Sequence, residues 1–422
     1  MGWLPGVGNG TTRMNRTAYA WTVVVLLWPV ALLNYLDRQM VSTIRASIRA
    51  DIPSIANDEQ FGVLMAMFMW VYAFLSPVGG YVADRFNRRW TLIGSLFVWS
   101  VVTWLTGHAN SYGEMKFYRA LMGVSEAFYM PAALALIADF HRGETRARAV
   151  GIHQTGIYAG LALGGIGGYI AQTSTWRNCF TWFGAAGVLY AIVLVFALRG
   201  APSESRTDGQ PRTPVTVVDT FRALWSQPAF WILVVYFTLP AIAGWATKNW
   251  LPTYLADTFK LKEGPAGLSA TGYIQLASFV GVLGGGVLAD RWMRRTPRGR
   301  IYASALGVLL CVPALLGLGW AWSIGAAIGF MILFGIGWGF FDCNNMPILC
   351  QIARPEHRAT GYGFMNLVSI SVGAGATIGL GWMRDRGIPF SAAFAFSAVV
   401  ALVSACLILL VKPRTDLERN VS

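Results

Sequence analysis

The chain has 422 residues, of which 55% are hydrophobic and 13% are charged, and its formal net charge is +13. Soluble domains carry about 25% charged residues, so this composition excludes an ordinary soluble protein and indicates a membrane protein. Most of the Lys and Arg fall in alternate loops between apolar runs. Positive loops stay in the cytoplasm, so the basic charge indicates membrane topology and argues against a nucleic-acid role.

Twelve apolar runs follow one another along the chain, and each is long enough to cross a bilayer as a helix. The strands of a membrane barrel would be about ten residues long with alternating polarity, a pattern that these runs lack. We therefore predict an all-α membrane protein. Its predicted spans are 18–44, 61–82, 91–109, 115–139, 147–171, 177–198, 229–256, 267–289, 301–322, 325–351, 360–383 and 389–411.

The longest hydrophilic gap divides these helices six and six. It contains APSESRTDGQPRTP, which is rich in Pro, Ser and charge and is typical of a linker. In chain order we predict a cytoplasmic tail, a six-helix bundle, a cytoplasmic linker, a second six-helix bundle and a second cytoplasmic tail. The bounds of these five segments are 1–17, 18–198, 199–228, 229–411 and 412–422.

The two halves repeat each other. GYVADRFNRR at 80–89 and GVLADRWMRR at 286–295 share the pattern G-xxx-D-R-xx-R-R. SEAFYMP at 125–131 likewise matches FDCNNMP at 341–347. In transporters, a repeat of this size builds two similar bundles that rock about a central site.

The repeated loop holds the residues that we predict to gate the protein. Its glycines permit close approach of neighbouring helices, and its carboxylates can accept bonds from Arg or from a helix N-terminus. The simpler alternative is that the arginines only set the topology. The predicted gating residues are Gly80, Asp84, Arg85, Arg88, Gly286, Asp290, Arg291 and Arg294.

The doubled loop, the six plus six helices and the long central loop resemble the Major Facilitator Superfamily over nearly the whole chain. This resemblance implies two pseudo-symmetric six-helix bundles that expose a central site to each side of the membrane in turn. It also implies that Asp84 belongs to a charge-relay latch that holds the cytoplasmic side closed.

Several ionisable residues lie inside the apolar runs, where a charge costs several kcal/mol and therefore needs a partner or a function. Arg119 and Glu126 are about two turns apart on one helix face. Ion pairs of Asp37 with Arg119, or of Glu126 with Arg38, could simply fix helix contacts. Alternatively, a carboxylate beside a cation titrates in a coupled way, and its protonation frees the cation for a substrate anion.

A finer resemblance bears on these charges. NYLDR at 34–38, the R-x6-E spacing of Arg119 and Glu126, and WLPTYL at 250–255 resemble the anion:cation symporter branch, which includes sugar-acid transporters. The resemblance implies that Asp37 and Glu126 are proton sites, that Arg119 partners them and that Arg38 serves the substrate. The segment from Arg119 to Phe140 also resembles the Spinster lipid transporters, which share the DR and R-x6-E elements.

Further polar residues in the apolar runs are candidates for substrate binding. A Lys ammonium can bind a carboxylate, and an Asn amide can bind hydroxyls. The alternatives are that the Lys reaches for the membrane surface and that the amides tie helices together. Besides Arg38, the predicted substrate-binding residues are Tyr35, Gln154, Lys248, Asn249, Asp342, Asn344 and Asn345.

We therefore expect a monomeric transporter of the bacterial inner membrane with both termini in the cytoplasm, which takes up a small organic anion such as a sugar acid together with protons. The alternatives are a Spinster-like proton-coupled lysolipid transporter and a membrane sensor that does not transport. The intact loop patterns disfavour the sensor. We expect no enzyme, cofactor or metal site, because the sequence shows no Ser/His/Asp arrangement, phosphate loop or metal-ligand spacing.

Overall fold

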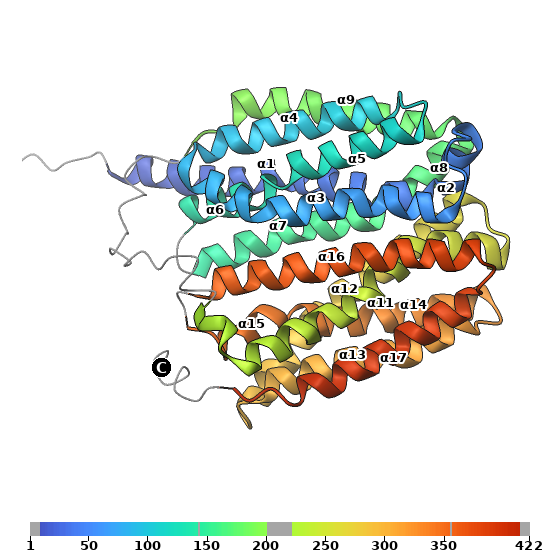
Figure 1. The fold of residues 1–422 in the computed structure, drawn as a ribbon. Coiled ribbons are helices and arrows are strands. Elements are labelled where there is room, and N and C mark those ends of the chain that lie inside the picture. The colour runs from blue at the N-terminus through green and yellow to red at the C-terminus, as the bar shows by residue number, and fades with distance from the viewer. Residues whose placement is uncertain (1–8, 142–143, 201–221, 355–356, 414–422) are drawn as a thin grey trace, which may run out of the picture.

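The computed structural model describes residues 9–141, 144–200, 222–354 and 357–413 (Figure 1). Within them every regular element is an α-helix, which confirms the predicted all-α class. Most of the predicted linker lies outside the described residues, as does most of the C-terminal tail. The predicted segment bounds therefore stay predictions.

The helices fall into two sets along the chain. The first set comprises α1 (Asn9–Thr43), α2 (Arg45–Asp51), α3 (Asp58–Arg85), α4 (Arg88–Thr106), α5 (Tyr112–Glu126), α6 (Tyr129–Phe140), α7 (Glu144–Leu163), α8 (Ile166–Thr173) and α9 (Trp176–Ala197). The second comprises α11 (Pro228–Phe259), α12 (Glu263–Met293), α13 (Gly299–Gly319), α14 (Ile324–Asp342), α15 (Asn345–Cys350), α16 (Arg358–Asp385) and α17 (Phe390–Ile408).

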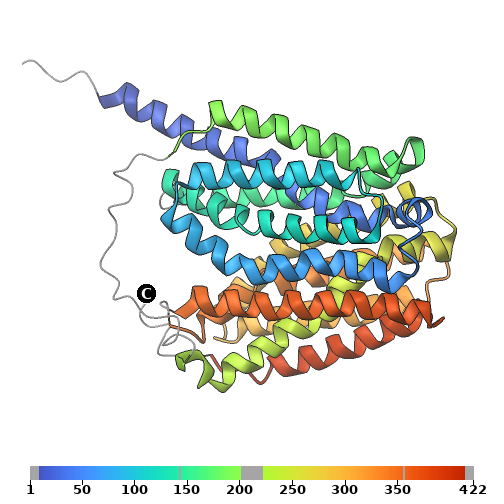
Figure 2. The ribbon, with the colours of Figure 1, turned by 45° about the horizontal axis from the view of Figure 1, so that its top comes forward.

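Ten segments of the described chain are long and apolar enough to cross a membrane. The two other predicted spans, 91–109 and 147–171, correspond to α4 and to the pair α7 and α8. Both α4 and α7 begin with a basic stretch, which lowers their apolar character. They nevertheless run alongside the other long helices, as both ribbon views show (Figures 1 and 2).

Each set of helices surrounds its own apolar core. One core of the first set includes the buried rings of Trp99 and Tyr129, and the core of the second includes those of Phe230 and Phe334. A third cluster joins the two sets, because Met40 of α1 packs in the same cluster as Trp250 of α11. The first set, coloured blue to green, lies on one side of the molecule, and the second lies on the other (Figure 1).

Two of the predicted spans are interrupted at matching places. Helix α5 ends at Glu126, and α6 begins directly after a break of two residues. Helix α14 ends at Asp342, and α15 likewise begins after a break of two residues. Pro131 and Pro347 follow these breaks at matching positions of the repeat. A proline lacks the N–H that would bond the carbonyl four residues earlier, so each weakens the helix at its break. The repeat therefore puts a carboxylate at the end of a broken helix in both halves.

The close helix approach expected at Gly80 and Gly286 occurs one residue earlier, so that detail of the prediction is wrong in this structure. A Cβ atom at Gly79 would lie 2.2 Å from the carbonyl oxygen of Ala127, and one at Gly285 would also crowd its neighbours. A Cβ atom at Gly80 or Gly286 would meet nothing within 4 Å. Adjacent helical residues diverge by about 100°, so only one glycine of each run faces the neighbouring helix.

Candidate functional site

A buried ion pair joins α1 to the end of α5. Nε of Arg38 donates to Oε2 of Glu126 at 2.5 Å, and the Glu126 side chain is 0% exposed. This is one of the two pairings considered from the sequence. Nη2 of Arg38 is buried and has no hydrogen-bond partner among the described residues. The guanidinium can therefore accommodate a second acceptor.

Three aromatic rings surround the Arg38 guanidinium. Its carbon lies 4.6 Å from the ring centroid of Tyr35, 5.0 Å from that of Phe68 and 4.4 Å from that of Tyr72. Contacts of this kind between a cation and aromatic rings are attractive and fix the orientation of the guanidinium. A cation with apolar walls suits an anion that also carries an apolar part.

The structure does not pair Asp37 with Arg119. Asp37 is 1% exposed and accepts a hydrogen bond from Oγ1 of Thr103 at 3.2 Å. Nε of Arg119 donates to the carbonyl of Leu64 at 3.3 Å, and its guanidinium lies 4.8 Å from the ring of Phe68. In the described part of the chain, no ion pair connects Arg119 to either acid. The alternative pairing predicted for Asp37 is therefore wrong in this state.

The predicted amides differ in their contacts. Nδ2 of Asn249 donates to Oγ1 of Thr377 at 3.1 Å, which ties α11 to α16. Asn344 is fully buried and donates to the carbonyl of Phe340 at 2.8 Å. Asn345 is fully buried, and Gln154 is half-buried. Both amide atoms of Asn345 and the amide oxygen of Asn344 have no hydrogen-bond partner among the described residues, so they are available to a ligand.

The second predicted cation lies on the other half. Nζ of Lys248 is 3.9 Å from the ring centroid of Trp338, and the side chain of Asp342, one turn further along α14, is exposed. Lys248 and Asp342 are close enough to interact electrostatically. The predicted membrane charges therefore gather into two groups, one from each half.

The predicted gating residues make contacts within their own halves. Arg88 forms an ion pair with Asp139, and Asp290 accepts a hydrogen bond from Arg300 at 2.7 Å. The guanidinium of Arg85 lies 4.7 Å from the ring of Tyr81. Arg291 and Arg294 are exposed, and the side chain of Asp84 lies outside the described residues. A gating role for these residues stays a prediction.

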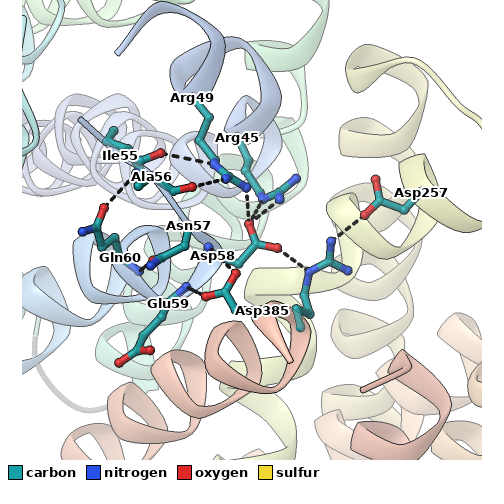
Figure 3. Close-up of polar contacts among 11 residues, drawn as sticks. Arg45, Arg49, Ile55, Ala56, Asn57, Asp58, Glu59, Gln60, Asp257 and Asp385 are labelled. Atoms are coloured by element: carbon teal, nitrogen blue, oxygen red, sulfur yellow. Dashed lines mark hydrogen bonds and ion pairs between the residues drawn. The ribbon is translucent and has the colours of Figure 1, made fainter. Parts of the chain in front are cut away.

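A network of charged residues that was not predicted from the sequence lies at the opposite end of the helices, as Figure 3 shows. Asp58, at the start of α3, pairs with Arg45, with Arg49 at 2.6 Å and with Arg384 of α16 at 2.7 Å. Its side chain is only 6% exposed. One carboxylate therefore holds three arginines from both halves of the chain.

Two more carboxylates complete this outer network, by which we mean Arg45, Arg49, Asp58, Asp257, Arg384 and Asp385. Asp385 accepts hydrogen bonds from the backbone N–H groups of Asp58 at 2.9 Å and Glu59 at 2.8 Å. A carboxylate at a helix N-terminus satisfies free N–H groups and is favoured by the helix dipole. Arg384 also donates to Asp257 at 2.7 Å, which brings in α11 (Figure 3).

Polar contacts between the halves lie at this end or near the middle of the helices. Near the middle, Nε1 of Trp70 donates to the carbonyl of Ser371 at 3.0 Å. Nearer the outer end, the N–H of Ser47 donates to Glu263 at 3.0 Å. At the end that carries the predicted gating loops, the described residues show no hydrogen bond or ion pair between the halves. Among the described residues, the ion pair between the halves, Asp58 with Arg384, therefore lies at the outer network.

The chain is similar to known membrane transporters. The family model of the Major Facilitator Superfamily matches residues 27–378. Protein spinster homolog 1 of Xenopus tropicalis is 27% identical over 393 residues, which cover 86% of this chain and 73% of that protein. Its Homo sapiens counterpart is 29% identical over 391 residues, with the same two coverages.

A solved structure has the same fold. It is a bacterial homologue of the human lysosomal transporter Spinster in an inward-facing and occupied conformation. It matches with a TM-score of 0.76 at 20% identity, over 93% of this chain and 97% of that one. The Spinster-like features found in the sequence are thereby confirmed.

Proposed function

Because the chain belongs to the Major Facilitator Superfamily, whose fold serves membrane transport rather than enzyme catalysis, we propose that it couples the movement of an organic anion to protons by alternating access. The observation that carries this proposal is the Arg38–Glu126 pair. It is buried, it has one unpartnered guanidinium nitrogen, and it joins two helices of one half.

Proton transfer to Glu126 would remove the counter-charge of Arg38. A buried cation without a partner is costly, so Arg38 would then attract the anionic group of a substrate. Loss of the proton restores the carboxylate, which competes with the substrate for Arg38 and favours its release. The three surrounding rings keep the guanidinium in place through both steps. Asp37, buried on the same helix, is the second proposed proton carrier, and Arg119 lies near both acids.

A lysolipid is the second candidate substrate. The Spinster relatives favour it, and so do the aromatic rings around Arg38, which suit an anion attached to an apolar chain. A sugar acid would need free hydrogen-bonding groups for its hydroxyls. Asn249 already bonds to Thr377 of α16, whereas neither amide atom of the buried Asn345 has a hydrogen-bond partner among the described residues. The rings around Arg38 therefore support an amphiphilic anion, and the unpartnered amide of Asn345 keeps a sugar acid as a candidate.

Thermal unfolding of the purified protein in the presence of sugar acids, simple carboxylates and lysolipids tests the proposed substrate class. A ligand that binds only the folded state raises its stability by about 2.7 kcal/mol at a hundred times its Kd. We expect an anionic compound of this panel to raise the unfolding temperature, and we expect Arg38→Ala to abolish that rise. Equal stabilisation of the wild type and the variant would show that Arg38 is not part of the binding site.

We further propose that the protein is a monomer of a bacterial inner membrane with both termini in the cytoplasm. The two ends of the described chain lie at the end of the molecule opposite the outer network (Figure 1). The basic loops lie at the same end, as the charge distribution requires. With this orientation the outer network lies on the outer side of the membrane. A C-terminal reporter that fluoresces only in the cytoplasm tests the orientation, and a dark reporter would contradict it.

A further inference from the structure

A second carboxylate occupies the place in the C-terminal half that Glu126 occupies in the N-terminal half. Asp342 is the last residue of α14, as Glu126 is the last residue of α5, and each precedes a two-residue break in its helix. The aligned repeats SEAFYMP and FDCNNMP put the two acids at the same position. The sequence repeat and the positions of the helix ends therefore both identify these acids as counterparts.

Each of these acids has a cation on the first long helix of its own half. Arg38 lies on α1, and Lys248 lies on α11. The Lys248 ammonium rests on the ring of Trp338, four residues before Asp342 on α14. Residues four apart share a helix face, so this contact holds the ammonium beside the turn that carries Asp342. The molecule thus contains two charge pairs built on the same plan.

The two pairs differ in their contact with water. Glu126 is 0% exposed and bonds to Arg38, whereas Asp342 is exposed and has no hydrogen bond or ion pair in the described part of the chain. The groups that interact electrostatically with Asp342 come from both halves of the molecule. They are Lys248 of α11, Tyr35 of α1, Tyr158 of α7, Tyr362 of α16 and the adjacent Cys343. Asp342 therefore faces the space between the halves.

We propose that Asp342 is a second proton-coupling carboxylate, with Lys248 as its counter-cation. A negative charge at this position would repel an anion bound at Arg38. A proton taken up from water by a carboxylate oxygen of Asp342 removes that repulsion and frees the Lys248 ammonium to interact with the anion. Return of the proton to water on the open side restores the Asp342 charge, its attraction to Lys248 and the repulsion of the anion.

This inference rests on the proposed proton-coupled function and deepens it. With Glu126 and Asp342 in equivalent positions, one proton would be carried by each half. Because Asp342 is exposed, it would exchange its proton with water faster than the buried Glu126. These two consequences can be measured separately, and the first measurement needs no substrate.

Infrared difference spectroscopy of the purified full-length protein, between neutral and acidic pH, detects carboxyl groups as they take up protons. We expect the wild type to show a protonated carboxyl band that exchanges quickly in heavy water and is lost in Asp342→Asn. The equivalent substitution Glu126→Gln, as the matched variant, should remove a different band that exchanges slowly. Asparagine is nearly isosteric at this exposed position, and thermal unfolding checks that the variant is folded.

An unchanged spectrum in folded Asp342→Asn would overturn the inference, because Asp342 would then not change its protonation between the two pH values. A second experiment measures transport of whichever sugar acid, simple carboxylate or lysolipid the protein is found to carry. The number of protons moved per anion should fall by about half in Asp342→Asn, and an unchanged ratio would also overturn the inference. If no anion drives proton movement in the wild type, the proposed function fails. The infrared measurement still tests the protonation of Asp342 in that case, because it needs no transported anion.

Discussion

Replacing Arg38 with alanine is expected to lower the free energy of unfolding by about 3–5 kcal/mol and to abolish anion binding. The substitution leaves the Glu126 carboxylate buried, 0% exposed, without the guanidinium that contacts it at 2.5 Å. It also empties the space between the rings of Tyr35, Phe68 and Tyr72. Unfolding in detergent followed by tryptophan fluorescence measures the first effect, and ligand-dependent thermal shifts measure the second.

A double substitution separates the uncompensated charge from the lost packing. Arg38→Met with Glu126→Gln removes both charges and keeps much of the side-chain volume, and exchanges of this kind for a buried pair are often neutral. We expect the double variant to regain most of the lost stability but none of the anion binding. A double variant as unstable as Arg38→Ala would show that the charge of Glu126 is not the cause of the instability.

The second large effect is expected from Asp58→Asn at the outer network. Asparagine cannot hold three arginines, so the substitution weakens the contacts of α3 with Arg45, Arg49 and Arg384 (Figure 3). Losing even about 3 kcal/mol of this closure changes the ratio of closed to open molecules more than a hundredfold, since about 1.4 kcal/mol is a factor of ten. We expect the outer end to open and the gating loops to close.

Spin labels at the exposed positions Ala56 and Lys260, one on each half, report the opening of the outer end. We expect longer label-to-label distances in Asp58→Asn than in the wild type, in a background without other reactive cysteines. Asp257→Asn is the matched control, because Asp257 is 47% exposed and pairs only with Arg384 at this network. Exposed pairs contribute about 0–1 kcal/mol, so this control should keep the wild-type distances. Wild-type distances in Asp58→Asn would mean that the network does not hold the outer end closed.

The sequence predicts the helices well because run length and apolar composition are local properties. The breaks after Glu126 and Asp342 were not predicted, although Pro131 and Pro347 follow each of them. A proline inside an apolar run is common in membrane helices and does not by itself interrupt them. The presence of a proline therefore does not tell an interrupted span from a continuous one.

The site could be predicted only in part. The ionisable residues inside the spans identify Arg38 and Glu126, since a buried charge requires a partner. The sequence does not decide between their pairing and that of Asp37 with Arg119, because the rotation of each helix is set by packing. The outer network was not predicted for a different reason. Asp58 and Arg384 lie at the ends of spans, where charges usually only set the topology. The fold alone brings them together.

Proton movement into liposomes that contain the reconstituted protein tests the central claim most directly. A pH-sensitive dye inside the liposomes records the flux when a sugar acid or a lysolipid is added outside. We predict that one of these anions carries protons with it in the wild type, and that Glu126→Gln abolishes the proton flux while exchange of the anion across the membrane continues. Transport of the anion by the wild type without any proton flux, or a proton flux unchanged in Glu126→Gln, would contradict the proposed coupling.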